Sequence, residues 1–327
     1  TMLPRGRITV DGAVSSATGA ANASSVSFSH TTGTGSNRLL LVGVSWNAGS
    51  TDRTISSVTF TPSGGSAVTL SPVITQKVPS QLRYSAIYRW PASTALPSGQ
   101  AGTVAITFSG AVSNGIVAGA ANFAGVNQTT PLGTAAGAGA ASQGTTPTVT
   151  LTGLSGNELV FDNVFMGGND SSQTLTAGAG QTQLWNAFVS NTRAAASTEK
   201  ATGSSVTMSW TAASSAWWAI AAVPINPAPA YDLTVAVDGV GTTSPAAGVH
   251  TYTPGTVVPV TPTPAAGYVF DHWSGACIGS GTCSVTMDAD KTVTAHFAVN
   301  VAVAISKPSG YPLLTWPHQA AAVDHYA

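Results

Sequence analysis

The chain has 327 residues, of which eleven are Lys or Arg and twelve are Asp or Glu, giving a formal net charge of -1 at pH 7. Charged residues make up only 7% of the chain, against roughly 25% in an average globular protein, and no basic stripe is present that could neutralise a phosphate backbone. We therefore expect no nucleic-acid partner. We also expect no membrane insertion, because the longest apolar runs, such as 217–223, fall short of the roughly 18 residues of a spanning helix.

Residues 1–226 show short strand patterns and no helical periodicity. Apolar residues alternate with other residues, as in Leu40, Val42, Val44 and Trp46, which places one set on one face of a strand. Clusters of Gly, Ser, Thr, Asn and Pro interrupt the strands at intervals of roughly ten residues, which is typical of sandwiches and jelly rolls. The sequence predicts an all-β chain that begins with a large β-sandwich over 1–226.

Two stretches of this domain, 115–126 and 216–225, are apolar on both faces and rich in Ala and Gly. Such strands are typical of the middle of a sheet that is covered on both sides. Residues 1–226 also resemble the jelly-roll-like modules of large extracellular bacterial proteins, on the runs 36–44, 55–60 and 123–131. That resemblance implies a fold and no particular activity.

Aromatic residues alternate along one predicted strand of this domain. Tyr84, Tyr88 and Trp90 share one face of the strand, and Arg83 and Arg89 share the other. If the arginines face solvent, the aromatic side chains belong to the core. If the aromatic side chains face outward, they form a platform on which a sugar ring could stack.

Oxygen-bearing side chains gather once in the sequence, at Asp162, Asn169 and Asp170. Calcium takes such oxygens from loops, but the alternating Asp spacing of a calcium loop is missing, so an ordinary turn is the competing interpretation. No other cofactor is expected. The chain's two glutamates, Glu158 and Glu199, are interpreted as solvated charges at strand edges rather than as the paired carboxylates of a glycosidase.

A short Pro-Ala linker over 227–230 ends the first domain, because alternating prolines cannot join a strand ladder. A second unit follows over 231–298, with strands predicted at 232–237, 257–263, 267–273 and 291–297. Cys277 and Cys283 lie six positions apart across a Gly-Ser-Gly turn, a spacing that suits a disulfide across a hairpin. A disulfide indicates an oxidising compartment, so we expect an extracellular or cell-surface location.

Motifs run in order through the second unit: Leu233-Thr234-Val235, Gly255-Thr256-Val257-Val258, Gly267-Tyr268-Val269-Phe270, Trp273-Ser274-Gly275 and Val293-Thr294-Ala295-His296-Phe297. On these motifs, residues 231–298 resemble the divergent InlB B-type bacterial repeat. The resemblance implies a β-grasp-like fold and occurrence in surface and secreted proteins.

The remaining residues, 299–327, resemble the start of a fibronectin type III-like domain. Two or three strands cannot close a sandwich. Either the chain is a fragment of a longer protein, or a neighbouring copy supplies the missing strands by strand addition.

Two hypotheses for function follow. The first is a non-enzymatic structural or adhesive surface protein of a bacterium, whose partners are copies of itself or other surface proteins and which assembles through its terminal segments. The alternative is a carbohydrate-binding accessory region of a secreted enzyme that acts on polysaccharide.

Overall fold

The computed structural model describes residues 7–167, 174–304 and 315–317, with backbone alone from residue 302 onward, and these ranges contain β-strands and no helix. The all-β class and the sandwich architecture predicted from the sequence are therefore confirmed. Within the same ranges there is accordingly no helix of the length and apolarity that crossing a membrane requires. Two compact units can be distinguished, Arg7–Ala228 and a C-terminal unit that begins at Pro229.

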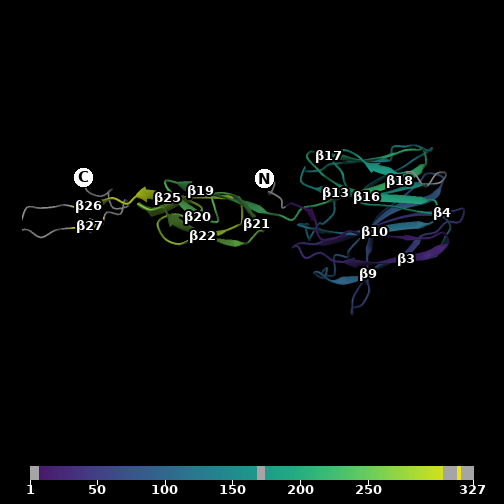
Figure 1. Ribbon diagram of the computed structural model, residues 1–327, viewed down its shortest axis with the longest axis horizontal. Helices are drawn as coiled ribbons and strands as arrows, with labels where there is room; N and C mark the ends of the chain where they lie inside the picture. The colour runs from purple at the N-terminus through teal and green to yellow at the C-terminus, as the bar shows by residue number, and fades with distance from the viewer. Residues whose placement is uncertain (1–6, 168–173, 305–314, 318–327) are drawn as a thin grey trace, which may run out of the picture. The chain divides into compact units, whose positions relative to one another are not determined.

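The first unit contains four sheets, which make two sandwiches (Figure 1). In the first sandwich, a central sheet with the order β1-β10-β4-β8-β7, and with β2 also paired to β10, packs on an outer sheet with the order β3-β9-β5-β6. The central strands are β1 (Thr9–Val10), β2 (Ser15–Gly19), β4 (Leu39–Gly49), β7 (Ser71–Lys77), β8 (Leu82–Arg89) and β10 (Ile116–Ala124). The outer strands are β3 (Ala23–Thr31), β5 (Ile55–Pro62), β6 (Val68–Thr69) and β9 (Ala101–Val112).

The second sandwich also has a central and an outer sheet. Its central sheet has the order β11-β18-β13-β16-β15 and its outer sheet the order β12-β17-β14. The central strands are β11 (Ala136–Gly139), β13 (Leu159–Gly167), β15 (Thr182–Val189), β16 (Thr192–Lys200) and β18 (Trp217–Ile225). The outer strands are β12 (Thr148–Thr152), β14 (Leu175–Ala177) and β17 (Ser205–Ala212).

The two sandwiches repeat one topology. β13 takes the place of β4 in the strand order, β18 that of β10, β16 that of β8, and β17 that of β9. The sequences that begin β4 and β13 also correspond, with Asn37-Arg38-Leu39-Leu40 matched by Asn157-Glu158-Leu159-Val160. The first unit is therefore a structural duplication, whereas a single large sandwich was expected over 1–226.

The central sheets are buried on both faces because they pack against each other as well as against their own outer sheets. In β4, Val42 and Val44 face the core of the first sandwich, whereas Leu41 packs between the two central sheets against β13 and β18. β10 and β18 are buried along nearly their whole length, as their apolar sequences predicted. A separate apolar cluster fills the second sandwich.

Close approach of the two central sheets depends on glycine. A Cβ atom at Gly119 would lie 2.5 Å from the indole of Trp185, and one at Gly43 would lie 2.6 Å from Asn163 Oδ1. Asn163 Nδ2 donates hydrogen bonds to the hydroxyls of Ser45 and Ser85 across this interface. Small residues on the first sandwich thus accept the larger side chains of the second.

The C-terminal unit contains two larger sheets and a short hairpin (Figure 1). One sheet has the order β21-β19-β25-β23, with β19 and β25 parallel, and the other has the order β20-β22-β24. Their strands are β19 (Tyr231–Asp238), β20 (Gly241–Ser244), β21 (Gly248–Tyr252), β22 (Val257–Pro264), β23 (Tyr268–Gly275), β24 (Cys283–Thr286) and β25 (Lys291–Val299). A further pair is formed by β26 (Ala302–Ala304) and β27 (Thr315–Pro317), and the rest of the predicted fibronectin-like segment lies outside the described residues.

One apolar cluster joins the two larger sheets of the C-terminal unit. Leu233, Val260, Val293 and Ala295 are almost fully buried, and Trp273 is the largest buried side chain. A core of this size depends on large aromatic side chains, because a small unit buries a low fraction of its surface. The strands predicted from the sequence in this unit correspond to β19, β22, β23 and β25.

Candidate functional site

A groove opens in the C-terminal unit where β22 and β24 separate. The ladder between these strands ends at the pair Val260 and Cys283. Successive N–H groups along a strand point alternately to its two neighbours. By this alternation, the next N–H directed at β24 would come from position 262, which is Pro262. Proline has no N–H, and the carbonyl of Gly281 instead accepts a hydrogen bond of 3.1 Å from Trp273 Nε1. The two strands therefore diverge beyond this pair.

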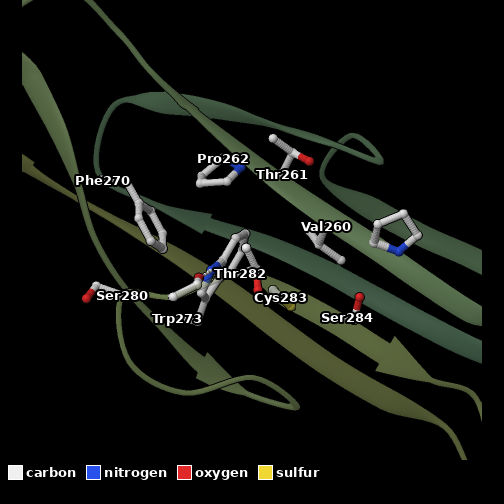
Figure 2. A pocket seen from close by; sticks show the side chains of 11 residues that line it. Val260, Thr261, Pro262, Phe270, Trp273, Ser280, Thr282, Cys283 and Ser284 are labelled. Carbon is white, nitrogen blue, oxygen red and sulfur yellow. Dashed lines mark hydrogen bonds between the residues drawn. The ribbon is translucent and has the colours of Figure 1, made fainter.

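The groove has a volume of about 530 Å³, within the range of small-ligand and peptide sites. Figure 2 shows Phe270 and Trp273 beside Pro262 and Thr282. No charged residue is among those that line the groove, which are Pro259, Val260, Thr261, Pro262, Phe270, Trp273, Ser280, Gly281, Thr282, Cys283 and Ser284. The groove suits an uncharged segment that has both apolar and hydrogen-bonding groups.

The apolar side of the groove is an aromatic pair. The ring centroids of Phe270 and Trp273 are 4.9 Å apart at an angle of 53°, and Phe270 also contacts Phe297 edge-on. Trp273 is 2% exposed and belongs to the core, whereas Phe270 is half-buried. Phe270 is therefore the ring that an incoming side chain can reach.

A disulfide fixes the loop on one side of the groove. Cys277 and Cys283 are bonded, with their sulfur atoms 2.10 Å apart, as the spacing predicted. The closed loop contains Ser280, Gly281 and Thr282 of the groove lining, and it also contains Ile278, which is 85% exposed. The disulfide thus presents an apolar side chain and part of the groove on one short loop.

Exposed apolar side chains are concentrated in the C-terminal unit. Among the described residues, six of the eight large hydrophobic residues that are exposed lie in this unit. The six are Val240, Val249, Val257, Ile278, Val299 and Val301. Single exposed apolar residues are ordinary, and it is contiguous patches of them that mark contact sites.

Part of the chain that includes β19 to β25 is similar to a known module. Residues 231–301 match the model of the divergent InlB B-repeat domain. InlB-type repeats are typical of bacterial surface proteins, and the disulfide accords with an extracellular location. Comparisons with curated proteins and with solved structures found no match.

Of the three aromatic residues considered for sugar stacking, Tyr84 and Trp90 lie in the core of the first sandwich and Tyr88 packs against it. Tyr84 is 7% exposed, stacks on Trp46 at 4.6 Å and donates a hydrogen bond to Asp52. Trp90 is 5% exposed and meets Phe60 edge-on, and Tyr88 packs against the same cluster. The Tyr84 and Trp90 rings are therefore buried and Tyr88 is partly buried, and burial raises the pKa of the Tyr84 and Tyr88 hydroxyls.

Asp162, one of the three residues considered for calcium, is completely buried inside the second sandwich, and Asn169 and Asp170 lie outside the described residues. The Asp162 carboxylate accepts hydrogen bonds from the N–H and the hydroxyl of Ser197 and from Trp210 Nε1. Burial raises its pKa to about 7, although these hydrogen bonds act in the opposite direction. Asp162 is thus a strand residue in a core and not a loop ligand.

Glu158 is also buried, contrary to the interpretation of a solvated charge. Its carboxylate accepts hydrogen bonds from the backbone N–H groups of Ser155, Gly156 and Asn157 and from the Ser155 hydroxyl. Burial acts to raise its pKa, but these hydrogen bonds prevail and lower it. Burial raises the pKa of Glu199, the other glutamate.

Within the described ranges, no three or more His, Cys, Asp and Glu side chains are grouped so that they could hold a metal ion. The groove could not be predicted from local sequence patterns, because its walls come from β22, β23 and a loop that are separate in the sequence. One local signal was available. Pro262 lies within the predicted strand 257–263, and a proline inside a strand pattern marks a place where pairing on one side stops.

Proposed function

We propose that this chain is a non-enzymatic bacterial surface protein that adheres to further copies of itself through its InlB-type repeat. The observation that carries the proposal is the uncharged groove between β22 and β24, beside a disulfide loop that exposes Ile278. The repeat itself supports a surface location.

The charge content of the chain supports a second copy as the occupant. Repulsion between like charges keeps many soluble proteins apart, and this chain has a formal net charge of -1 with few ionisable groups. An encounter between two copies therefore has little electrostatic repulsion to overcome. An uncharged segment of one copy meets an uncharged groove on another without desolvating an ion.

The edge strand beside the groove supplies backbone groups for an extended segment. Among the described strands, β24 pairs with β22 on one side and with none on the other. The N–H groups of Ser284 and Thr286 alternate with those directed at β22 and so point to the unpaired side. Strand addition along such an edge gives affinity through the backbone, and an adjoining pocket for a side chain gives specificity.

Sedimentation of the full chain over a range of concentrations tests the proposal, with a variant that fills the groove. A Cβ atom at Gly281 would meet no atom within 4 Å and the residue needs no unusual backbone angle, so Gly281→Trp adds a bulky side chain to the groove lining without backbone strain. We expect the wild type to associate reversibly with rising concentration and Gly281→Trp to remain monomeric at the same concentrations.

Gly203→Trp is the matched control, because Gly203 also has no neighbour within 4 Å but lies in the second sandwich. It should associate like the wild type. A wild-type chain that stays monomeric at every concentration, or a Gly281→Trp variant that associates as strongly as the wild type, overturns the proposal.

A further inference from the structure

A pocket of about 290 Å³ lies at one end of the first sandwich, where β4 begins and β8 ends. Two arginines, Arg38 and Arg89, line it, although the whole chain has only eleven basic residues. No Asp or Glu is among the lining residues. The pocket therefore concentrates positive charge in a chain that is otherwise poor in it.

The two arginines have different surroundings. Arg38 Nη1 and Nη2 donate to the carbonyls of Gly35 and Leu96, both at 2.7 Å, while its Nε is buried and has no partner. Arg38 thereby holds the loop that follows β8. The guanidinium of Arg89 has no hydrogen-bond or ion-pair partner among the described residues, so all its donors remain for a ligand.

The loop between β8 and β9 makes the other wall of the pocket. It runs over 90–100, whereas the corresponding connection between β16 and β17 in the second sandwich covers only 201–204. The second sandwich also has Glu158 at the position of Arg38 and Thr198 at the position of Arg89. The pocket is thus a feature of one copy of a duplicated fold and is not needed to build that fold.

Its remaining lining combines polar and apolar groups. Ser93 and Thr94 are exposed on the loop, and Leu39, Pro91 and Pro131 supply apolar surface. A volume of about 290 Å³ is at the lower end of the range for ligand pockets. A small molecule with one anionic group, several hydroxyls and an apolar face fits these groups.

We propose that this pocket binds a hydroxy-carboxylate of monosaccharide size, with a uronic acid as the representative ligand. The Arg89 guanidinium binds the carboxylate in a bidentate manner, as planar guanidinium groups do. The loop hydroxyls of Ser93 and Thr94 bind the sugar hydroxyls, and the prolines contact the ring face.

Calorimetric titration of the full chain with sodium glucuronate tests the proposal, with glucose, acetate and sulfate as comparison ligands. We expect saturable binding of glucuronate that is at least about tenfold tighter than that of the other three. Hydrogen bonds to a charged group are strong enough that Arg89→Gln should weaken glucuronate binding by about tenfold or more.

Arg53→Gln is the matched control, because Arg53 follows β4 at the opposite end of the same sandwich and its loss changes the net charge equally. It should leave binding unchanged. Ala92→Trp should block binding by filling the pocket while keeping both arginines, and thermal melting verifies that each variant is folded.

Three results overturn the proposal. They are the absence of saturable glucuronate binding, unchanged binding in Arg89→Gln, and equal affinity for acetate, sulfate and glucuronate. Each is independent of whether the chain associates with itself, because the pocket lies in a different unit from the groove.

Discussion

Trp210 Nε1 donates a hydrogen bond of 2.7 Å to the carboxylate of Asp162 inside the second sandwich. In the first sandwich the corresponding positions hold Val42 and Phe108, which pack in an apolar core. The duplicated fold therefore has a carboxyl group at this core position in one copy only. Loss of a hydrogen-bond donor to a buried carboxyl group destabilises the folded state, because the group left without its partner cannot be solvated by water instead.

The raised pKa of Asp162 predicts how stability varies with pH. An Asp in an unfolded chain titrates near 3.9, whereas burial raises the pKa of Asp162 to about 7 in the folded protein. Between these values the folded state holds a proton that the unfolded state has released, so the contribution of Asp162 to stability falls as pH rises from about 4 to about 7. Calorimetric melting at pH 5 and pH 8 should show this loss in the wild type.

Asp162→Asn isolates that contribution, because every other titrating group is the same in both proteins. The variant should lose less stability than the wild type between pH 5 and pH 8, whatever its absolute stability. The prediction fails if both proteins show the same change in melting temperature.

The close contact of Gly119 with Trp185 predicts that a larger residue at position 119 destabilises the interface of the two central sheets. A methyl group there would lie 2.5 Å from the ring of Trp185, which is only 5% exposed and has little room to move. Gly119→Ala should reduce the free energy of unfolding by about 1–3 kcal/mol, as overpacking of a core does. Urea denaturation measures the change, and Gly203→Ala, which meets no atom within 4 Å, should be close to neutral.

The alternation of Leu40, Val42, Val44 and Trp46 correctly predicted the face of β4 that forms a core, because the period of a strand is a local property. The fit of Trp185 against Gly119 could not be predicted in this way, since the two residues come from different sandwiches and neither sequence signals the other.

The surroundings of Asp162 could not be predicted from neighbouring residues in the sequence either. Its neighbours in sequence indicated an oxygen-rich turn, but its hydrogen-bond donors, Ser197 and Trp210, come from β16 and β17. The duplication was within reach of the sequence, because Asn37-Arg38-Leu39 and Asn157-Glu158-Leu159 can be compared directly. That comparison would have placed Asp162 on a buried strand, at the position of Val42.

Removal of the disulfide should loosen one wall of the groove. Closing a loop of this length contributes roughly 2 kcal/mol in the chain-entropy model, so the double variant Cys277→Ser/Cys283→Ser should open this region more often. Hydrogen exchange followed by mass spectrometry should show faster exchange in peptides that cover 276–287 and unchanged exchange in peptides from β10. Equal exchange over 276–287 in both proteins would contradict the prediction.

The exposure of Ile278 predicts that the disulfide loop contributes to self-association. Its side chain is 85% exposed, and complete burial of such a side chain at an interface is worth about 1.5–3 kcal/mol. Ile278→Ser should therefore weaken association of the full chain by about tenfold or more, as measured by sedimentation. Val249, on the edge strand β21, is 63% exposed and is not part of the groove lining. If general hydrophobicity drives association, Val249→Ser weakens it to a similar extent, whereas if contact is made at the loop, Val249→Ser leaves it unchanged.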